Sequence, residues 1–218
     1  MIRVKKNEVA PVSLSNTTAY DGEDVRKQLL EDQQEKCYIC ERRVSIDFEI
    51  EHRQSEENYE ELSQNWNNLL LVCPYCNKKK LHRFDGILDP IACDIEEEIL
   101  QNVDFGNNKA IFVPLYDSDA HRQTAHLLDR VFNGRAVMRT VREEKFFECF
   151  LSQINRFLVL INAFLSSPTE ELNKAVADDL TVSNEYLGFK YWIIKEHPVL
   201  YRTFAENIVW NKNSRFTE

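Results

Sequence analysis

Two short motifs decide the fold of this chain, CYIC at residues 37–40 and CPYC at residues 73–76. In each motif the two cysteines are spaced so that both thiolates can bind the same ion. Together they complete a tetrahedral shell that is closed and therefore structural, and we predict that Zn²⁺ is bound by Cys37, Cys40, Cys73 and Cys76. The alternative interpretation is two unrelated CxxC pairs that are buried or redox-active.

The composition is that of an ordinary globular protein. The chain has 218 residues, 43% hydrophobic and 29% charged, so it is long enough to bury a core without disulfides. Its longest strongly apolar run, residues 157–165, is far shorter than the roughly 20 residues that a membrane-spanning helix requires. The first residues lack the apolar segment of a secretory signal. We therefore predict no membrane segment and a cytoplasmic location.

The charge balance limits how the chain could bind nucleic acid. With 36 acidic and 27 basic residues the net charge is −9, which argues against a protein that coats a polyanion through its overall charge. Any binding of nucleic acid must therefore be local. A further hypothesis is that such a chain relies on another subunit to hold its substrate.

Periodicity and capping residues predict a mainly helical chain with few strands. Alternating apolar residues predict a strand from Val44 to Glu51-His52, and two shorter strands are predicted at residues 99–103 and 110–115. Residues 54–68 are predicted to form a loop. Helices are predicted at residues 21–34, from Asn77, at residues 118–134 and 138–165, and after Pro168, Ser183 and Pro198.

The longest predicted helix carries an apolar seam. Its members follow a spacing of four and three residues and are Phe147, Leu151, Ile154, Leu158, Ile161 and Leu165. We interpret this seam as the core of a C-terminal helical bundle, with a partner-binding stripe as the alternative. Cys93 and Cys149 are interpreted as buried apolar residues. The remaining histidines, His82, His121, His126 and His197, show no pattern of catalytic partners.

The segment between the two cysteine motifs holds the candidate functional residues. Its 32 residues are more than a plain zinc ribbon requires. Glu51-His52 end the predicted strand, Asn68 lies five residues before Cys73, and Asn77 directly follows Cys76. A basic run, Lys78-Lys79-Lys80-Leu81-His82-Arg83, comes next. By itself, such a run is a solvated helix face, and an isolated Asn68 would be a turn or cap residue.

This order of residues resembles HNH endonucleases, whose ββα-metal finger is braced by a four-cysteine zinc site. The run Ile50-Glu51-His52-Arg53 and the segment from Asn65 to Asn77 are most similar to PtuB-type nucleases of bacterial Septu and retron-associated antiphage systems. The resemblance covers about residues 37 to 83. It implies a partner, a PtuA-like ABC-type ATPase, and it extends to a retron reverse transcriptase with its nucleic acid.

The resemblance also implies a role for each candidate residue. His52 matches the general base, a task suited to an imidazole, and Asn68 matches the central Asn that orients His52 or holds the loop. Glu51 and Asn77 match the ligands of a catalytic divalent cation, Mg²⁺ or Mn²⁺. The residues that would contact phosphates of the nucleic acid are Arg53, Lys78, Lys79, Lys80 and Arg83. Asn77 replaces the more common histidine, and Arg53-Gln54-Ser55 replaces a frequent Phe-Arg-Pro.

We thus predict a mainly α protein with a zinc-braced ββα-metal (HNH, His-Me) finger and an appended helical bundle. Three segments are expected: an N-terminal arm and leading helix (1–36), the finger (37–85) and a helical domain (86–218). The predicted function is hydrolysis of phosphodiester bonds in DNA or RNA, as the effector nuclease of an antiphage complex. The alternatives are a zinc-finger adaptor that binds nucleic acid or a protein without cutting, and a redox protein that uses its CxxC pairs.

Overall fold

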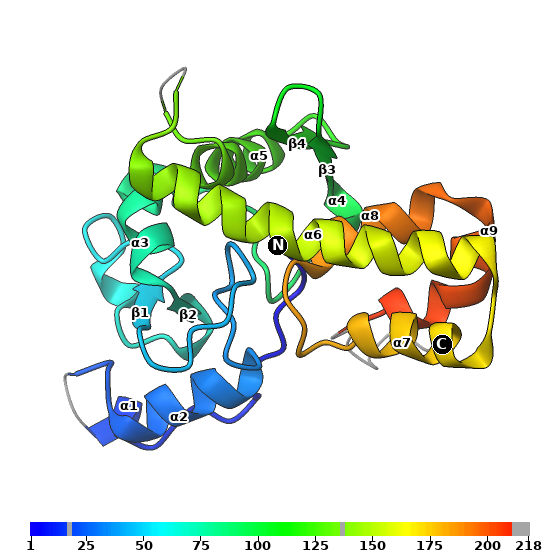
Figure 1. Cartoon of the computed structure of the whole chain (residues 1–218). Helices are drawn as coiled ribbons and strands as arrows, with labels where there is room; N and C mark the ends of the chain where they lie inside the picture. Colours follow the sequence, from blue (N-terminus) through cyan, green and yellow to red (C-terminus); the bar gives the residue numbers. More distant parts are fainter. Residues whose placement is uncertain (17–18, 136–137, 211–218) are drawn as a thin grey trace.

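Figure 1 shows a computed structural model of the chain, described over residues 1–16, 19–135 and 138–210. Helices form about half of it. In chain order the helices are α1 (Ser13–Asn16), α2 (Glu23–Asp32), α3 (Pro74–Lys80), α4 (Ile95–Glu98), α5 (Asp119–Phe132), α6 (Val141–Ser166), α7 (Glu170–Asp179), α8 (Leu187–Glu196) and α9 (Pro198–Phe204). The strands are β1 (Glu49–His52), β2 (Leu69–Val72), β3 (Ile99–Asp104) and β4 (Lys109–Pro114). Single 3₁₀ turns are η1 (Glu60–Leu62), η2 (Trp66–Asn68), η3 (His82–Phe84) and η4 (Ala205–Ile208).

The finger is an antiparallel pair, β1 with β2, followed directly by α3. The predicted strand from Val44 is wrong at its start, because β1 begins only at Glu49. Glu49 pairs with Val72, the last residue before Cys73 turns the chain into α3, so earlier residues have no partner strand. Ile46, in the predicted strand, is 90% exposed.

Helix α3 begins three residues earlier than predicted, at Pro74 instead of Asn77. Proline is favoured in the first turn of a helix, where its missing N–H would be unpaired in any case. The Cys73 sulfur accepts a hydrogen bond from the Cys76 N–H at 3.4 Å and so caps the helix. The helix therefore starts inside the second cysteine motif, and Asn77 lies within it.

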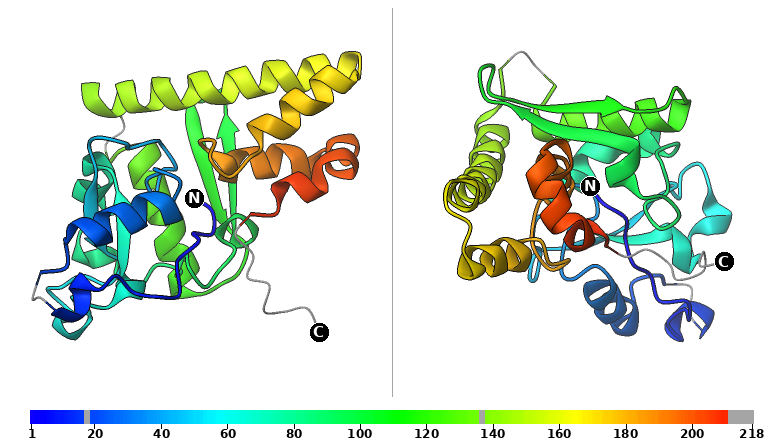
Figure 2. Two further views of the ribbon diagram at one scale, coloured as in Figure 1. Left: turned by 90° about the horizontal axis from the view of Figure 1, so that it is seen from below. Right: turned by 90° about the vertical axis from the view of Figure 1, so that its right-hand side faces the viewer.

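The hairpin of β3 and β4 confirms the two strands predicted after Pro90. Helix α5 packs on β4 and follows its predicted signals at both ends. The Ser118 side chain accepts the N–H of His121 at the start of α5, and Gly134 lies just beyond its end with φ +83°. This hairpin and α5 lie between the finger and the C-terminal helices (Figure 2).

Helix α6 runs along one side of the molecule and joins two hydrophobic cores (Figure 2). Its first half contributes Phe146, Phe147 and Phe150 to the core shared with the finger, and its second half contributes Phe157 and Phe164 to the core of α7–α9. The phenylalanines are thus the centre of the buried face, whereas Leu151, Leu158 and Leu165 of the predicted seam are half-buried. Cys149 is exposed and Cys93 half-buried, so the prediction that both are buried is wrong.

By length and composition alone, α6 could cross a membrane, and it is the one such helix in the described part of the chain. Core helices of globular proteins meet the same criterion. The phenylalanines of α6 are buried inside this protein, and Arg156 in its second half is 67% exposed. These features are those of a core helix, and a membrane protein is not indicated.

The C-terminal helices pack as predicted, but one of them starts later. Helix α9 begins at Pro198, and α7 begins just after Pro168 with Thr169 as its cap. Helix α8 begins at Leu187 and not near Ser183. Its first N–H groups, from Leu187 and Gly188, donate at 2.7 and 3.1 Å to the carboxylate of Glu41, next to the first cysteine motif. A distant side chain therefore satisfies this helix end.

The N-terminal arm lies across the finger and the β3 hairpin (Figure 2). Met1, Val4 and Leu14 are buried in the same core as residues of the finger, α5 and α6. The Val4 N–H donates to the Pro90 carbonyl at 2.7 Å. One core thus takes residues from all three predicted segments, and the boundaries at 36 and 85 stay a prediction.

Candidate metal centre and active site

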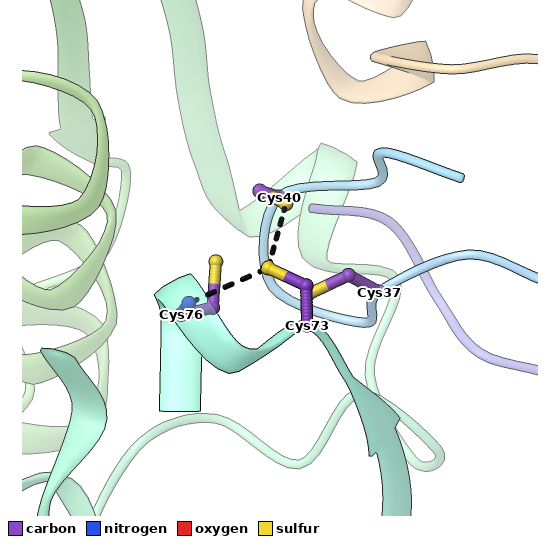
Figure 3. Close-up of side chains that lie close together, drawn as sticks. All are labelled: Cys37, Cys40, Cys73 and Cys76. Atoms are coloured by element: carbon purple, nitrogen blue, oxygen red, sulfur yellow. Dashed lines mark hydrogen bonds between the residues drawn. The ribbon is translucent and has the colours of Figure 1, made fainter. Parts of the chain in front are cut away.

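The four cysteines of the two motifs converge on one point (Figure 3). Cys37 and Cys40 come from the loop after α2, Cys73 follows β2, and Cys76 lies in the first turn of α3. All four sulfurs lie within 4.8 Å of one another, and those of Cys40 and Cys73 are 3.9 Å apart. The alternative of two unrelated CxxC pairs is therefore wrong.

This cluster fits a zinc ion in both geometry and charge. Bonds of about 2.3 Å in a tetrahedron place the sulfurs about 3.8 Å apart, close to the spacing observed. All four side chains are buried. Burial raises the pKa of Cys40 and Cys76, whereas hydrogen bonds from the other thiols lower the pKa of Cys73. Buried thiolates require a compensating cation, so Cys37, Cys40, Cys73 and Cys76 could hold structural Zn²⁺.

His52 ends β1 and is almost completely buried, with 7% of its surface exposed. Its Nε2 lies 3.0 Å from the carbonyl oxygen of Ser63, and the ring of Tyr20 meets the imidazole edge-on at 4.5 Å. Because a carbonyl only accepts hydrogen bonds, Nε2 carries a proton, which in a neutral imidazole leaves Nδ1 with the free lone pair. The ring is thus held in one tautomer and one orientation.

A polar seam joins β1 to α3, formed by Glu49, Glu51, Asn77 and Lys80. The Asn77 Nδ2 donates to Glu49 at 2.7 Å, and the Lys80 ammonium lies 2.9 Å from the Glu51 carboxylate. Both carboxylates therefore face α3, as expected for alternate residues of a strand. The structure does not bring Glu51 and Asn77 into direct contact, since each has a different partner.

Burial raises the pKa of Glu51, against the attraction of Lys80, which lowers it. The donors of the seam are nevertheless of the kind that Mg²⁺ and Mn²⁺ bind. Each Glu offers carboxylate oxygens, and the Asn77 amide oxygen is left over when its Nδ2 donates to Glu49. Glu51 and Asn77 could thus hold such an ion, with Glu49 beside them.

The predicted phosphate-binding residues do not share one surface. Lys78 and Arg83 are exposed, but Lys79 pairs with Glu143 of α6. Lys80 is fully buried, and besides Glu51 it contacts the His52 carbonyl oxygen at 3.0 Å and Asp85 at 3.7 Å. Lys80 therefore cannot reach a phosphate at the surface, because its ammonium points into the finger. Arg53 lies 3.7 Å from Asp89.

Asn68 is buried and holds the loop between the two strands of the finger. Its Oδ1 accepts the Gln54 N–H at 2.8 Å, and its Nδ2 donates to the carbonyls of Gln54 and Leu62 at 2.9 and 3.3 Å. Of the two roles predicted for Asn68, these contacts are those of a residue that holds the loop. Ser63, whose carbonyl faces His52, lies next to Leu62.

Four residues of the site were not singled out in the sequence. Asp85 accepts hydrogen bonds from the Ser55 N–H and hydroxyl at 2.8 and 2.6 Å and so fixes the chain after His52. Ser63, in the loop between the two strands, contacts His52 through its carbonyl oxygen. Tyr20, which precedes α2, contacts His52 through its ring. Glu49 had a signal, since it lies two residues before Glu51 on the predicted strand. The other three are brought in by chain returns that local spacing does not encode.

Comparison with known families agrees with this architecture. No curated protein matches the chain. A family model described as HNH endonuclease matches residues 37–83, the segment that contains both cysteine motifs, His52, Asn68 and Asn77. The match ends where the finger does, and the helices after it are outside. Residues 37–83 of this chain are therefore an HNH endonuclease domain.

Proposed function

We propose that this chain is a metal-dependent endonuclease that hydrolyses phosphodiester bonds, with His52 as the general base. The observation that carries the proposal is the contact between His52 Nε2 and the Ser63 carbonyl at 3.0 Å. It leaves Nδ1 as the proton acceptor, and it does so inside an HNH endonuclease domain. Nδ1 would take a proton from the water that attacks phosphorus, a task for an imidazole held in a fixed orientation.

The surroundings of His52 support this role. Tyr20 and the Ser63 carbonyl restrict the ring, and Asn68 restricts the loop to which Ser63 belongs. Pre-positioned groups avoid the cost of ordering at the moment of reaction. Lys80 holds the carbonyl of His52, and Asp85 fixes the chain that follows it. We assign these four side chains, Tyr20, Asn68, Lys80 and Asp85, to positioning.

Glu51 and Asn77 are the residues that would hold the catalytic cation, Mg²⁺ or Mn²⁺. When bound, such an ion supplies positive charge that stabilises the phosphate oxygens and the leaving group. Glu51 contributes carboxylate oxygens from β1, where it directly precedes His52. Asn77 contributes an amide oxygen from α3. Lys78 and Arg83, both exposed at the finger helix, would contact the nucleic acid backbone.

The test is cleavage of plasmid DNA and of total tRNA with Mg²⁺ or Mn²⁺. Wild type should cut at least one of them, and His52→Ala should abolish cutting while the chain stays folded and keeps its zinc content. His82→Ala is the matched control, because His82 lies in the same finger but is 54% exposed and pairs with Glu57, itself an exposed residue. Equal cutting by wild type and His52→Ala would exclude His52 as the base.

One observation favours a second candidate, an adaptor that has kept the finger but does not cut. The Lys80 ammonium already neutralises Glu51 at 2.9 Å, where a catalytic cation would need the carboxylate. An adaptor would bind nucleic acid or a protein without metal-dependent turnover. The same assay separates the two, since the adaptor predicts no cleavage by wild type with either ion.

The biological setting is proposed on the resemblance over residues 37–83. We propose a cytoplasmic effector nuclease of a bacterial antiphage complex, beside an ABC-type ATPase and, in retron-associated systems, a reverse transcriptase with its nucleic acid. Co-expression of the tagged chain with its genomic neighbours would test this proposal. Recovery of an ATPase at a fixed ratio to the chain supports it, and recovery of the chain alone contradicts it.

A further inference from the structure

Two arginines meet over the Phe84 ring at the C-terminal end of the finger helix, and a third follows α5 a few residues later in the chain. Arg83 lies in η3, Arg130 in the last turn of α5, and Arg135 just after the end of α5. The guanidinium groups of Arg83 and Arg130 each lie 5.9 Å from the ring centroid of Phe84. Helix α3 also contacts the last turn of α5, since the Tyr75 hydroxyl donates to the Val131 carbonyl at 2.8 Å. We call these three residues the arginine cluster.

Arg130 is the unusual member of the arginine cluster. It is only 7% exposed, and its Nε is buried without a hydrogen-bond partner. In the described part of the chain, none of Arg83, Arg130 and Arg135 forms an ion pair, whereas six arginines elsewhere do. A buried guanidinium nitrogen without a hydrogen-bond acceptor is costly, so the position of the Arg130 Nε calls for an explanation.

Glu143, the carboxylate whose charge acts to raise the pKa of Arg130, does not explain this position. Glu143 is bound by the Lys79 ammonium and accepts the Thr140 N–H at 2.8 Å. Burial would raise the pKa of Glu143, but the contacts with Lys79 and Thr140 outweigh it and lower that pKa to about 2. Glu143 is thus ionised and already compensated. Burial and the charges of Arg83 and Arg135 lower the pKa of Arg130 to about 10, so like charges crowd here.

The end of α5 accounts for only part of this arrangement. A cation in the last turn of a helix is stabilised by the roughly half negative charge of the C-terminal carbonyls. This partial negative charge can stabilise one arginine, but it is smaller than the three positive charges of the arginine cluster. The excess positive charge lies in a chain whose net charge is −9, which makes the arginine cluster a local site for an anion.

We propose that Arg83, Arg130 and Arg135 form a phosphate-binding site for the backbone of the nucleic acid, next to the HNH finger. The inference rests on the proposed function, and it extends the substrate surface from α3 to α5. Guanidinium groups donate paired hydrogen bonds that match phosphate oxygens. It also replaces the hypothesis that the acidic chain needs another subunit to hold its substrate, because the isolated chain then has its own phosphate contacts.

The test measures binding in a His52→Ala background, where the probe is not cut. The probes are a fluorescein-labelled DNA duplex and a single-stranded RNA of equal length, and anisotropy is followed from about 50 to about 200 mM salt. Adding Arg83→Gln and Arg130→Gln should weaken binding about tenfold or more at low salt. It should also reduce the slope of log affinity against log salt by about two, roughly one for each phosphate that is no longer neutralised.

Two further variants keep the result interpretable. Arg202→Gln is the matched control, because Arg202 also lies in the last turn of a helix, α9, and is exposed; it should change neither affinity nor slope. Arg135→Gln removes an exposed side chain and should reduce the slope by about one even if Arg130→Gln unfolds the chain.

Unchanged affinity and slope in the double variant and in Arg135→Gln would overturn the phosphate-binding site and leave the nuclease proposal standing. A parent that binds neither probe in a salt-dependent way would also overturn it. The nuclease itself is decided separately, by the cleavage assay with His52→Ala. Loss of binding to only one of the two probes would support the site and identify the class of nucleic acid.

Discussion

The two sides of the finger are built on different principles. On the zinc side, four identical side chains meet at one point. Within each motif the two cysteines are separated by only two residues. On the other side, the polar seam joins unlike groups from different elements, with each carboxylate held by its own partner on α3. The cysteine cluster could be completed by one external ion, whereas the side chains of the seam find their partners within the protein. Substitutions in the cysteine cluster and in the polar seam should therefore destabilise the protein to different extents.

The largest effect is expected from Cys40→Ser. Loss of one of four ligands should release the zinc ion, and structural zinc contributes roughly 10 kcal/mol or more of folding free energy. We expect less than one zinc per chain by elemental analysis, and loss of the cooperative thermal transition by circular dichroism.

Cys149→Ser is the control for that experiment, because Cys149 is free and exposed on α6. It should keep both zinc and thermal stability. A strong chelator should reproduce the Cys40→Ser result in wild type. A Cys40→Ser protein that unfolds at the wild-type temperature would show that the cluster does not brace the finger.

The same contrast explains what could be predicted from the sequence. The four-cysteine cluster, the β3–β4 hairpin, both ends of α5 and the start of α9 depend on motifs whose residues are a few positions apart, and the structure agrees with each of them. The start of α8 was missed because Glu41, far away in the chain, satisfies its first N–H groups. Lys80 was placed in a basic surface run, but one helical turn after Asn77 it faces β1 instead.

The candidate site divides in the same way. His52, Asn68, Glu51 and Asn77 were chosen from local motifs and the resemblance, and the structure gives each a contact within the finger. The partners that decide what those residues do, the Ser63 carbonyl and Glu49, depend on loop return and strand register. Arg130 carries no motif at all. Its lack of a partner is visible only once α5 is packed on the finger.

A smaller but substantial effect is expected on the seam side from Lys80→Met. Removing the buried ammonium leaves the carboxylates of Glu51 and Asp85 without their cation and the His52 carbonyl without a donor. Breaking a buried ion pair from one side costs about 3–5 kcal/mol. Urea unfolding should show this loss with zinc still bound.

Lys78→Met is the matched control for Lys80→Met, since Lys78 is the exposed lysine of the same helix. Its free energy of unfolding should stay within about 0.5 kcal/mol of wild type. If Lys80→Met were as stable as Lys78→Met, Lys80 would not stabilise the polar seam. The seam would then not be held by its own side chains, as the comparison of the two sides of the finger requires.

The smallest effect is expected from Asn68→Ala, which loosens the loop around the seam and leaves the zinc side intact. The substitution leaves the Gln54 N–H and two carbonyls without their partner, at a cost of about 1–3 kcal/mol. Because these contacts hold the loop that contains Ser63, amides of residues 54–65 should exchange hydrogen faster while those of α6 stay protected. Asn67→Ala removes the exposed neighbouring side chain and should leave this exchange unchanged. Equal protection in both variants would mean that Asn68 acts on His52 in some way other than through the loop.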